Sequence, residues 1–223
     1  MAQILLVPGA YHGGWYYTPL VPALRDAGHD VFTISLSGLE GPADRPRVSI
    51  NLDTHIADVV SLAEHEQLDD FVLCGHSYGG MVIAGAADRL PGRIKTLVFL
   101  DAIVPNNGDS VWSLWPSAMR EIFVAMAPDG LATAPPPGVD ARARAHPLAT
   151  FLQPISIGDH AYTARNKVYG LCAGDKESPF WGFHDRLAQE PDWITRKLKC
   201  GHDFMNQAPD QALAVILEAA ALA

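Results

Sequence analysis

The chain has 223 residues, 48% of them hydrophobic and 18% charged, which predicts one compact domain with a substantial core. Its formal net charge of −9, without a basic patch, argues against nucleic acid or an anionic membrane surface as a partner. No apolar run approaches the ~20 residues of a membrane span. We interpret residues 1–5 as a strand rather than as a signal peptide. Three cysteines with no C-x-x-C pair predict reduced thiols and a cytoplasmic location.

Short apolar runs and helical patterns alternate through the first half of the chain. Buried strands are predicted over residues 4–7, 31–35, 71–74 and 94–100. Thr18 followed by Pro19 predicts the start of a helix that ends at Gly28, because a cap residue precedes a proline. Asn51 or Asp53 can cap a second helix, after a polar loop over residues 37–47. A third helical pattern covers residues 81–87.

The alternation breaks after the fourth strand and resumes about fifty residues later. Residues 106–160 predict one or two helices and an irregular tail with a Pro-Pro-Pro-Gly break at 135–138. Two further strands are expected over 166–172 and 193–198, and two helices over 180–188 and 210–222. This pattern predicts an α/β fold, a doubly wound and mostly parallel six-stranded sheet. We expect a single domain, 1–223, with a core of 1–105 and 161–223 and a lid insertion of 106–160.

The motif Gly75-His76-Ser77-Tyr78-Gly79 stands between the third strand and the helix that follows it. A serine on such a sharp strand-to-helix turn holds its hydroxyl out of the sheet, and small neighbours make the turn possible. The helix N-terminus favours negative charge beside the serine. We therefore interpret Ser77 as a nucleophile.

A serine nucleophile needs a base, and the base needs an acid to orient it. His202 directly follows the last predicted strand, and Asp175 follows the fifth, so both lie at the sheet edge that carries Ser77. The chain order Ser77, Asp175, His202 fits this kind of sheet. Asp101, after the fourth strand, is a rival acid that the sequence does not separate from Asp175.

The oxyanion of an acyl-transfer reaction must be stabilised by fixed N–H groups. One should come from Tyr78, the residue after the nucleophile, and the other from Ala10 in the loop after the first strand. Among the other histidines, His76 is expected to pack beside its strand and His55 to lie on a solvated face. We find no metal-ligand spacing and no nucleotide-binding loop, and expect neither a metal nor a cofactor.

Three segments resemble the α/β-hydrolase superfamily, in the branch of plant methylesterases, hydroxynitrile lyases and their bacterial esterase relatives. They are residues 8–15 (PGAYHGGW), 75–80 (GHSYGG) and 201–205 (GHDFM). The resemblance covers residues 4–100 and 167–217 and fades in the expected lid. It implies the α/β-hydrolase fold, a triad of Ser77, Asp175 and His202, and an oxyanion hole formed by Ala10 and Tyr78.

The chain departs from the lyases of that branch after the catalytic histidine. The lyases carry a lysine there, which would stabilise departing cyanide, whereas this chain has Asp203, which would repel it. The first loop carries Gly9 where the lyases have a hydroxylated residue. These differences argue against lyase chemistry.

The large side chains of the expected lid suggest a compact apolar pocket, although each of them can instead simply pack against the core. The candidate substrate-binding residues are Tyr11, Trp112, Trp115, Met119, Phe123 and Met205. We expect a serine carboxylic ester hydrolase that acts on small to medium apolar or aromatic esters through an acyl-enzyme. A hydroxynitrile lyase-like enzyme and a ligand-binding receptor on a hydrolase scaffold are the alternatives. The only partner that we expect is the small-molecule substrate, and formation of a homodimer is left open.

Overall fold

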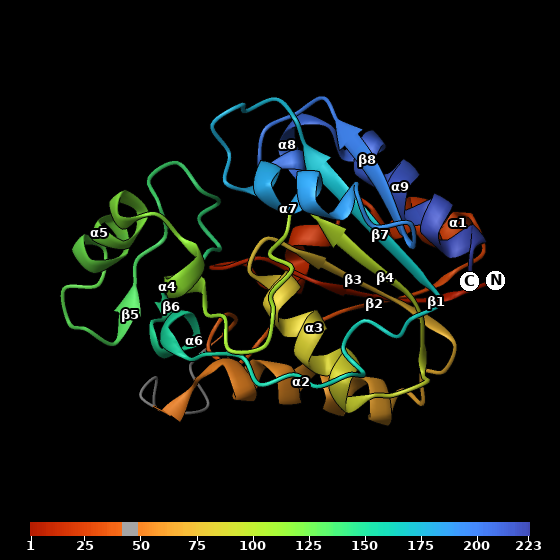
Figure 1. Cartoon of the computed structure of the whole chain (residues 1–223), viewed down its shortest axis with the longest axis horizontal. Helices are drawn as coiled ribbons and strands as arrows, with labels where there is room; N and C mark the ends of the chain where they lie inside the picture. Colours follow the sequence, from red (N-terminus) through yellow and green to blue (C-terminus); the bar gives the residue numbers. More distant parts are fainter. Residues whose placement is uncertain (42–48) are drawn as a thin grey trace.

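The core of the computed structural model, which describes residues 1–41 and 49–223, is a six-stranded sheet (Figure 1). Its strands are β1 (Gln3–Val7), β2 (Asp30–Thr33), β3 (Phe71–His76), β4 (Ile94–Leu100), β7 (Asn166–Cys172) and β8 (Trp193–Leu198). They lie in the order β2-β1-β3-β4-β7-β8, and every neighbouring pair is parallel. The strands match the predicted runs to within a few residues, because apolar segments buried on both faces are distinctive.

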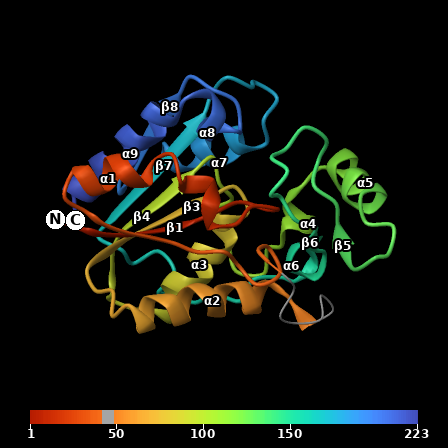
Figure 2. The same cartoon turned by 180° about the vertical axis from the view of Figure 1, so that it is seen from behind.

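Helices cover both faces of the sheet, as Figures 1 and 2 show from opposite sides. Helices α1 (Val21–Asp26) and α9 (Pro209–Ala221) bury their apolar faces in one core cluster. Helices α2 (Leu52–His65), α3 (Gly79–Arg89) and α7 (Phe180–Leu187) pack into the other. The doubly wound, parallel six-stranded sheet predicted from the sequence is therefore confirmed. Among the described residues, no helix is long and apolar enough to cross a membrane.

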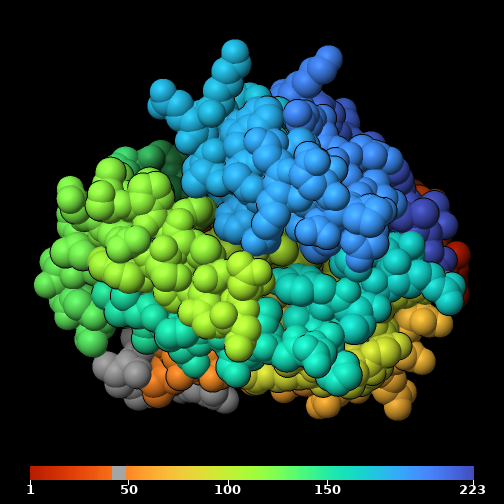
Figure 3. Space-filling model, in the orientation of Figure 1, coloured from red at the N-terminus to blue at the C-terminus, as the bar shows by residue number. Residues whose placement is uncertain are grey.

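Residues 106–160, called the insertion below, enter between β4 and β7 and build a separate group of short elements. These are α4 (Val111–Leu114), α5 (Ser117–Ala125), β5 (Ala132–Thr133), β6 (His146–Pro147) and α6 (Ala149–Leu152). The strands β5 and β6 form a small antiparallel pair. These short elements lie at one end of the molecule, at the left in Figure 1, and Figure 3 shows the surface of the same side.

The first helix begins later than the sequence predicted. A 3₁₀ helix, η1 (Gly14–Tyr17), occupies the segment before it. Thr18 ends this 3₁₀ helix, and its N–H donates a hydrogen bond to the Trp15 carbonyl at 3.1 Å. Thr18 and Pro19 therefore do not start α1, which begins at Val21 with Pro22 in its first turn. The prediction for α2 is confirmed for Asn51, which caps the helix in a capping box with Thr54. The predicted loop over 37–47 lies partly outside the described residues.

Candidate active site

Ser77 lies on the sharp turn between β3 and α3. Its φ of +54° is in the left-handed region, which is costly for a residue with a side chain. The turn is held from the next strand, because the Ser77 N–H donates to the Leu100 carbonyl at 3.3 Å. The Ser77 carbonyl in turn accepts the Ile103 N–H at 3.1 Å. The strained conformation therefore persists because β4 and the chain after it hold both ends of the residue.

The glycines of the motif are needed for close backbone contacts. A Cβ on Gly79 would lie 2.8 Å from the carbonyl oxygens of both Val7 and Pro8, and one on Gly75 would lie 2.8 Å from the Gly79 carbonyl oxygen. A Cβ on Gly9 would meet the Cβ of Ser77 at 2.9 Å. The G-x-S-x-G pattern thus allows the loop after β1 to pass directly beside the serine.

A chain of hydrogen bonds links the serine to a histidine and a buried carboxylate. Nε2 of His202 lies 2.9 Å from Oγ of Ser77, and its Nδ1 lies 2.7 Å from Oδ2 of Asp101. Because a carboxylate accepts at Nδ1, Nε2 is left to accept the serine proton. Asp101 is 1% exposed, and its Oδ1 accepts the Cys172 N–H at 2.9 Å. The three side chains have the geometry of a catalytic triad.

The carboxylate that meets His202 in the structure is that of Asp101 and not that of Asp175, in contrast to the sequence prediction. Asp175 is exposed, and its Oδ1 accepts the Glu177 N–H at 2.9 Å within its own turn. Sheet order explains the difference. Strand β4 is the direct neighbour of β3, with His76 opposite Leu100, so Asp101 lies level with the nucleophile. Both aspartates follow a strand in the sequence, and strand pairing alone separates them.

His202 lies between two rings that hold its imidazole. Phe180, at the start of α7, stacks on it with ring centroids 4.8 Å apart, and His76 lies 4.7 Å away on a tilted ring. The Nε2–H of His76 donates to the His202 carbonyl at 3.2 Å. Burial lowers the pKa of His76 well below its ordinary value, with the neighbouring His202 as a further cause. A neutral His76 therefore supports His202 without placing a second charge beside it.

Ser77 and His202 open into a pocket of about 330 Å³. The insertion supplies part of the wall of this pocket, the Pro-Pro-Gly stretch followed by Val139. The complete lining is Gly9, Ala10, Tyr11, His12, Tyr16, His76, Ser77, Pro136, Pro137, Gly138, Val139, His202 and Asp203. The insertion thus contributes to this pocket through its irregular stretch, which the sequence marked only as a helix-breaking segment.

Most of the aromatic residues expected to line the pocket have other positions. Among the described residues, Trp112, Trp115, Met119 and Phe123 are absent from its lining. Trp115 packs edge-on against Phe180, behind His202, and Phe123 packs against Phe151. Met119 is half-buried against the core, and Trp112 lines a separate shallow hollow beside α5. The helical spacing of these residues reflects packing of the insertion, and of the candidates only Tyr11 lines the serine pocket itself.

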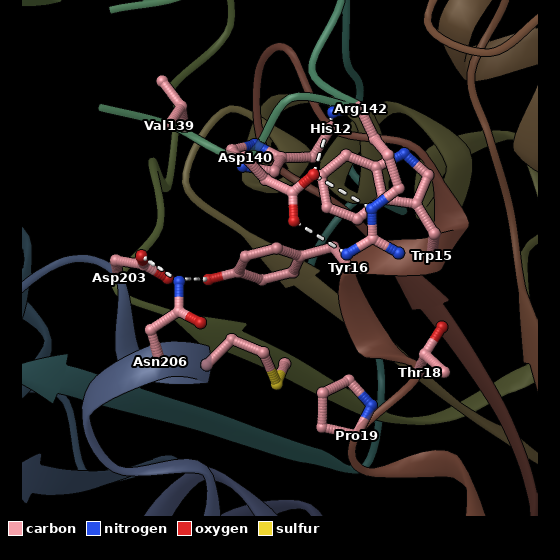
Figure 4. Close-up of a pocket in the computed structure, with 11 residues that line it drawn as sticks. His12, Trp15, Tyr16, Thr18, Pro19, Val139, Asp140, Arg142, Asp203 and Asn206 are labelled. Carbon is pink, nitrogen blue, oxygen red and sulfur yellow. Dashed lines mark hydrogen bonds and ion pairs between the residues drawn. The ribbon is translucent and has the colours of Figure 1, made fainter. Parts of the chain in front are cut away.

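Figure 4 shows a smaller cavity of about 190 Å³. It shares four lining residues with the serine pocket. Met205 lies in its wall. Arg142 of the insertion makes hydrogen bonds to Asp140 that lower the pKa of this carboxyl group. The Arg142 guanidinium also lies 4.2 Å from the ring centroid of Trp15. Asp203 stands between the two cavities, where it accepts a hydrogen bond from Asn206 at 2.6 Å.

His55 is buried beneath the nucleophile turn, whereas the sequence had placed it on a solvated face. Its Nε2–H donates to the Ser37 carbonyl at 3.0 Å, so its Nδ1 accepts the Tyr78 hydroxyl at 2.9 Å. Burial lowers the pKa of His55 from 6.5 to about 4. The polar residues next to it in the sequence suggested exposure, but its spacing from Leu52 and Val59 places it on the buried face of α2. Among the described residues, no cluster of side chains is suited to hold a metal.

Comparison with known proteins agrees with this fold. The model of the alpha/beta hydrolase family matches residues 4–215. A carbendazim hydrolyzing esterase from Nocardioides sp. (strain SG-4G) is 38% identical, over 95% of this chain and 96% of that protein. An alpha-hydroxynitrile lyase from Arabidopsis thaliana is 40% identical over 47% of this chain and 41% of its own length. An extracellular alpha/beta-hydrolase from a Paenibacillus species superposes with a TM-score of 0.84 at 22% identity, covering 99% of both chains.

The chain belongs to the alpha/beta hydrolase family. Its relatives include a bacterial esterase and plant methylesterases, so it falls among the carboxylesterase-type hydrolases of that family. The branch predicted from the sequence motifs is thereby confirmed.

Proposed function

We propose that this carboxylesterase-type hydrolase cleaves small to medium, largely apolar esters through an acyl-enzyme on Ser77. The observation that carries the proposal is the hydrogen-bond chain from Ser77 through His202 to Asp101, with links of 2.9 and 2.7 Å. Such an arrangement activates a hydroxyl that is a weak nucleophile on its own.

In the first half of the reaction, Oγ of Ser77 attacks the ester carbonyl carbon while Nε2 of His202 takes the hydroxyl proton. Asp101 stabilises the imidazolium that forms. The imidazolium then gives its proton to the departing alkoxide, which leaves as the alcohol. In the second half, His202 takes a proton from water, the hydroxide attacks the acyl carbon, and Ser77 recovers its proton as the acid departs.

The oxyanion formed in each half is assigned to the backbone N–H groups of Ala10 and Tyr78. Neither group has an acceptor among the described residues, so both are free to donate to a substrate oxygen. Ala10 also lines the serine pocket, and Tyr78 begins the turn into α3. Donors fixed in this way act most strongly where charge develops in the transition state.

The substrate class follows from the size and walls of the pocket. A volume of about 330 Å³ is at the lower end of small-molecule sites. Two prolines, Val139 and the ring of Tyr11 supply apolar surface, and the insertion acts as the lid that carries most of it. Because the 38% identical relative is a carbendazim hydrolyzing esterase, carbendazim is a specific candidate substrate for this chain.

Lyase chemistry is disfavoured by the position of Asp203. Its side chain lines the pocket beside His202, where a lyase of the cyanide-releasing kind needs positive charge.

The proposal is tested by hydrolysis of p-nitrophenyl acetate, p-nitrophenyl butyrate and carbendazim, with wild type and Ser77→Ala compared at matched concentrations. We expect wild type to turn over at least one ester, and we expect Ser77→Ala to lose turnover while its circular dichroism spectrum stays unchanged. Ester hydrolysis retained by Ser77→Ala would overturn the assignment. Cleavage of cyanohydrins but of no ester would favour the lyase alternative.

A further inference from the structure

We propose that His146, a residue of the insertion, is a positioning residue for the oxyanion hole, because it fixes the turn that carries the Ala10 N–H. This inference rests on the proposed esterase function. The proposal gives the insertion a second role besides lining the serine pocket. The evidence lies in the turn at residues 9–12, in the contacts made to it, and in the surroundings of the His146 ring.

The turn that contains Ala10 has an unfavourable residue at its third position. The His12 N–H reaches back to the Gly9 carbonyl at 3.4 Å, which makes Ala10 and Tyr11 the two central residues of a β-turn. Tyr11 has a φ of +69°, a conformation that this position of a type II turn normally gives to glycine or asparagine. Rotation of the peptide between the two central residues would relieve that strain, since type I turns accept most residues there.

Two imidazoles hold that central peptide at its two ends. Nδ1–H of His12 donates to the Ala10 carbonyl at 2.7 Å, and the Tyr11 N–H donates to Nδ1 of His146 at 3.2 Å. A rotated peptide would lose both hydrogen bonds and would turn the Ala10 carbonyl oxygen towards the Nδ1 lone pair of His146. The two histidines therefore fix the peptide that links Ala10 to Tyr11. Through this peptide they restrain the backbone of Ala10, whose own N–H is the proposed oxyanion donor.

The insertion makes two further hydrogen bonds to Tyr11. The Arg144 N–H donates to the Tyr11 carbonyl at 2.9 Å, and the Tyr11 hydroxyl lies 3.2 Å from Oγ1 of Thr133. Because Thr133 belongs to β5 and His146 to β6, the small antiparallel pair presents both contacts on one rigid piece. The strained turn is thus held from outside, by a segment that is remote from it in the sequence.

Burying a histidine at position 146 costs free energy, because one of its ring nitrogens has no hydrogen-bond partner among the described residues. This cost indicates that the other ring nitrogen, the acceptor Nδ1, is needed. The residue is fully buried, and its ring stacks on Phe151 with centroids 4.5 Å apart and meets Tyr78 edge-on. Since Nδ1 accepts a hydrogen bond, Nε2 carries the proton, and Nε2 is buried without a partner among the described residues. A leucine or phenylalanine would fill the same aromatic site without that cost. What histidine adds is the Nδ1 lone pair on the Tyr11 N–H.

Burial supports the required protonation state. It lowers the pKa of His146 well below its ordinary value, and the nearby His55 and His12 act in the same direction. His146 is therefore neutral at neutral pH and can accept a hydrogen bond. It does not line the serine pocket, so its effect on catalysis must pass through the turn.

The test compares two replacements of His146 in the whole 223-residue chain. His146→Leu keeps an apolar side chain and removes the acceptor, whereas His146→Asn offers a side-chain carbonyl oxygen near the position of Nδ1. His184→Leu is the matched control, since His184 is buried in α7 and lines neither cavity at the site. Turnover of p-nitrophenyl butyrate and inhibition by butylboronic acid, which forms a tetrahedral adduct with a serine, are measured for each protein.

We expect His146→Leu to lower kcat about 10- to 100-fold, because a misaimed donor costs part of what its complete loss would cost. Binding of butylboronic acid should weaken by a similar factor while KM stays nearly constant. His146→Asn should recover most of the lost kcat, and His184→Leu should resemble wild type. Equal kcat in wild type and His146→Leu would overturn the proposal, as would a rise in KM alone or equal losses in both His146 variants.

A measurement on the wild type keeps the proposal testable if the variants do not fold. Nitrogen-15 NMR of labelled histidine should show His146 with Nδ1 unprotonated and Nε2 protonated at pH 7. A proton on Nδ1 would overturn the assignment, because that atom could then not accept from Tyr11. A wild-type enzyme that hydrolyses no ester would instead refute the proposed function, so the two failures are distinguishable.

Discussion

At the scale of single residues, the position of the acid depends on which strand neighbours the nucleophile. Oδ2 of Asp101 lies 2.7 Å from Nδ1 of His202, whereas Asp175 lies in an exposed turn. We predict that Asp101→Asn lowers kcat by orders of magnitude, on the order of 10⁴ in the serine-protease precedent, because it favours the wrong tautomer of the imidazole. Asp175→Asn should leave kcat within about twofold, as expected for a surface change.

Steady-state kinetics with p-nitrophenyl butyrate provide the comparison, and thermal unfolding shows whether both variants are folded. A large loss in Asp175→Asn together with an active Asp101→Asn would mean that the hydrogen bond between His202 and Asp101 does not orient the catalytic base.

Local sequence was sufficient to predict that Ser77 and His202 lie close together, but not which carboxylate lies beside them. The serine lies in a motif whose glycines are required because a side chain at their positions would clash with neighbouring backbone. The histidine lies in the segment after the last strand of the sheet. The acid could not be chosen, because Asp101 and Asp175 both follow strands and only sheet order brings one of them to the histidine. The burial of His55 was missed although its spacing from Leu52 and Val59 places it on the inner face of α2, and no role was predicted for the buried His146.

At the scale of elements, helix α3 packs closely on the chain after β4. One of its glycines lies so near that chain that no residue with a side chain fits in its place. A Cβ on Gly80 would lie 2.1 Å from the carbonyl oxygen of Ile103, which is backbone and cannot rotate away. We predict that Gly80→Ala lowers the free energy of unfolding by about 3 kcal/mol, the upper part of the range for overpacking.

The matched control is Gly182→Ala in α7, where a Cβ would meet nothing within 4 Å. Since alanine is the better helix former, we expect this change to raise the free energy of unfolding by up to about 1 kcal/mol. Urea denaturation measures both variants. Equal stabilities for the two would show that α3 and the segment after β4 are not in the tight contact described.

The elements of the sheet were predictable, and those of the insertion were only partly so. Buried parallel strands are recognisable in a sequence as continuous apolar runs. The observed ends of the strands differ from the predicted ends by only a few residues. The helix start at Thr18 was wrong because the preceding 3₁₀ helix uses that residue as its own end. In the insertion, the aromatic residues predicted a pocket wall, but spacing alone could not tell packing inward against Phe151 or Phe180 from facing a substrate.

At the scale of the whole molecule, buried histidines make stability depend on pH. His55 has a pKa of about 4 in the folded protein and 6.5 without burial, so the unfolded chain binds the additional proton between these values. Stability is therefore fully present above pH 6.5 and is lost as the pH falls towards 4. For His55 alone, we expect the free energy of unfolding to fall by about 2 kcal/mol between pH 7 and pH 5.

Urea denaturation at several pH values tests this dependence. His55→Gln keeps an amide that can bridge Ser37 and Tyr78 but does not titrate, so its stability should fall less steeply over the same range. His76 and His146, whose pKa values burial also lowers, should leave some dependence in that variant. Identical slopes in wild type and His55→Gln would contradict a neutral buried His55.

The measurement that tests the central claim most directly is the intact mass of the enzyme, quenched during the first turnover of p-nitrophenyl butyrate. We predict a burst of p-nitrophenol together with a butyryl adduct, which peptide mapping places on Ser77 and which is absent from Ser77→Ala. A folded wild-type enzyme that hydrolyses the ester without any adduct, or with an adduct on another residue, would contradict acyl transfer through Ser77.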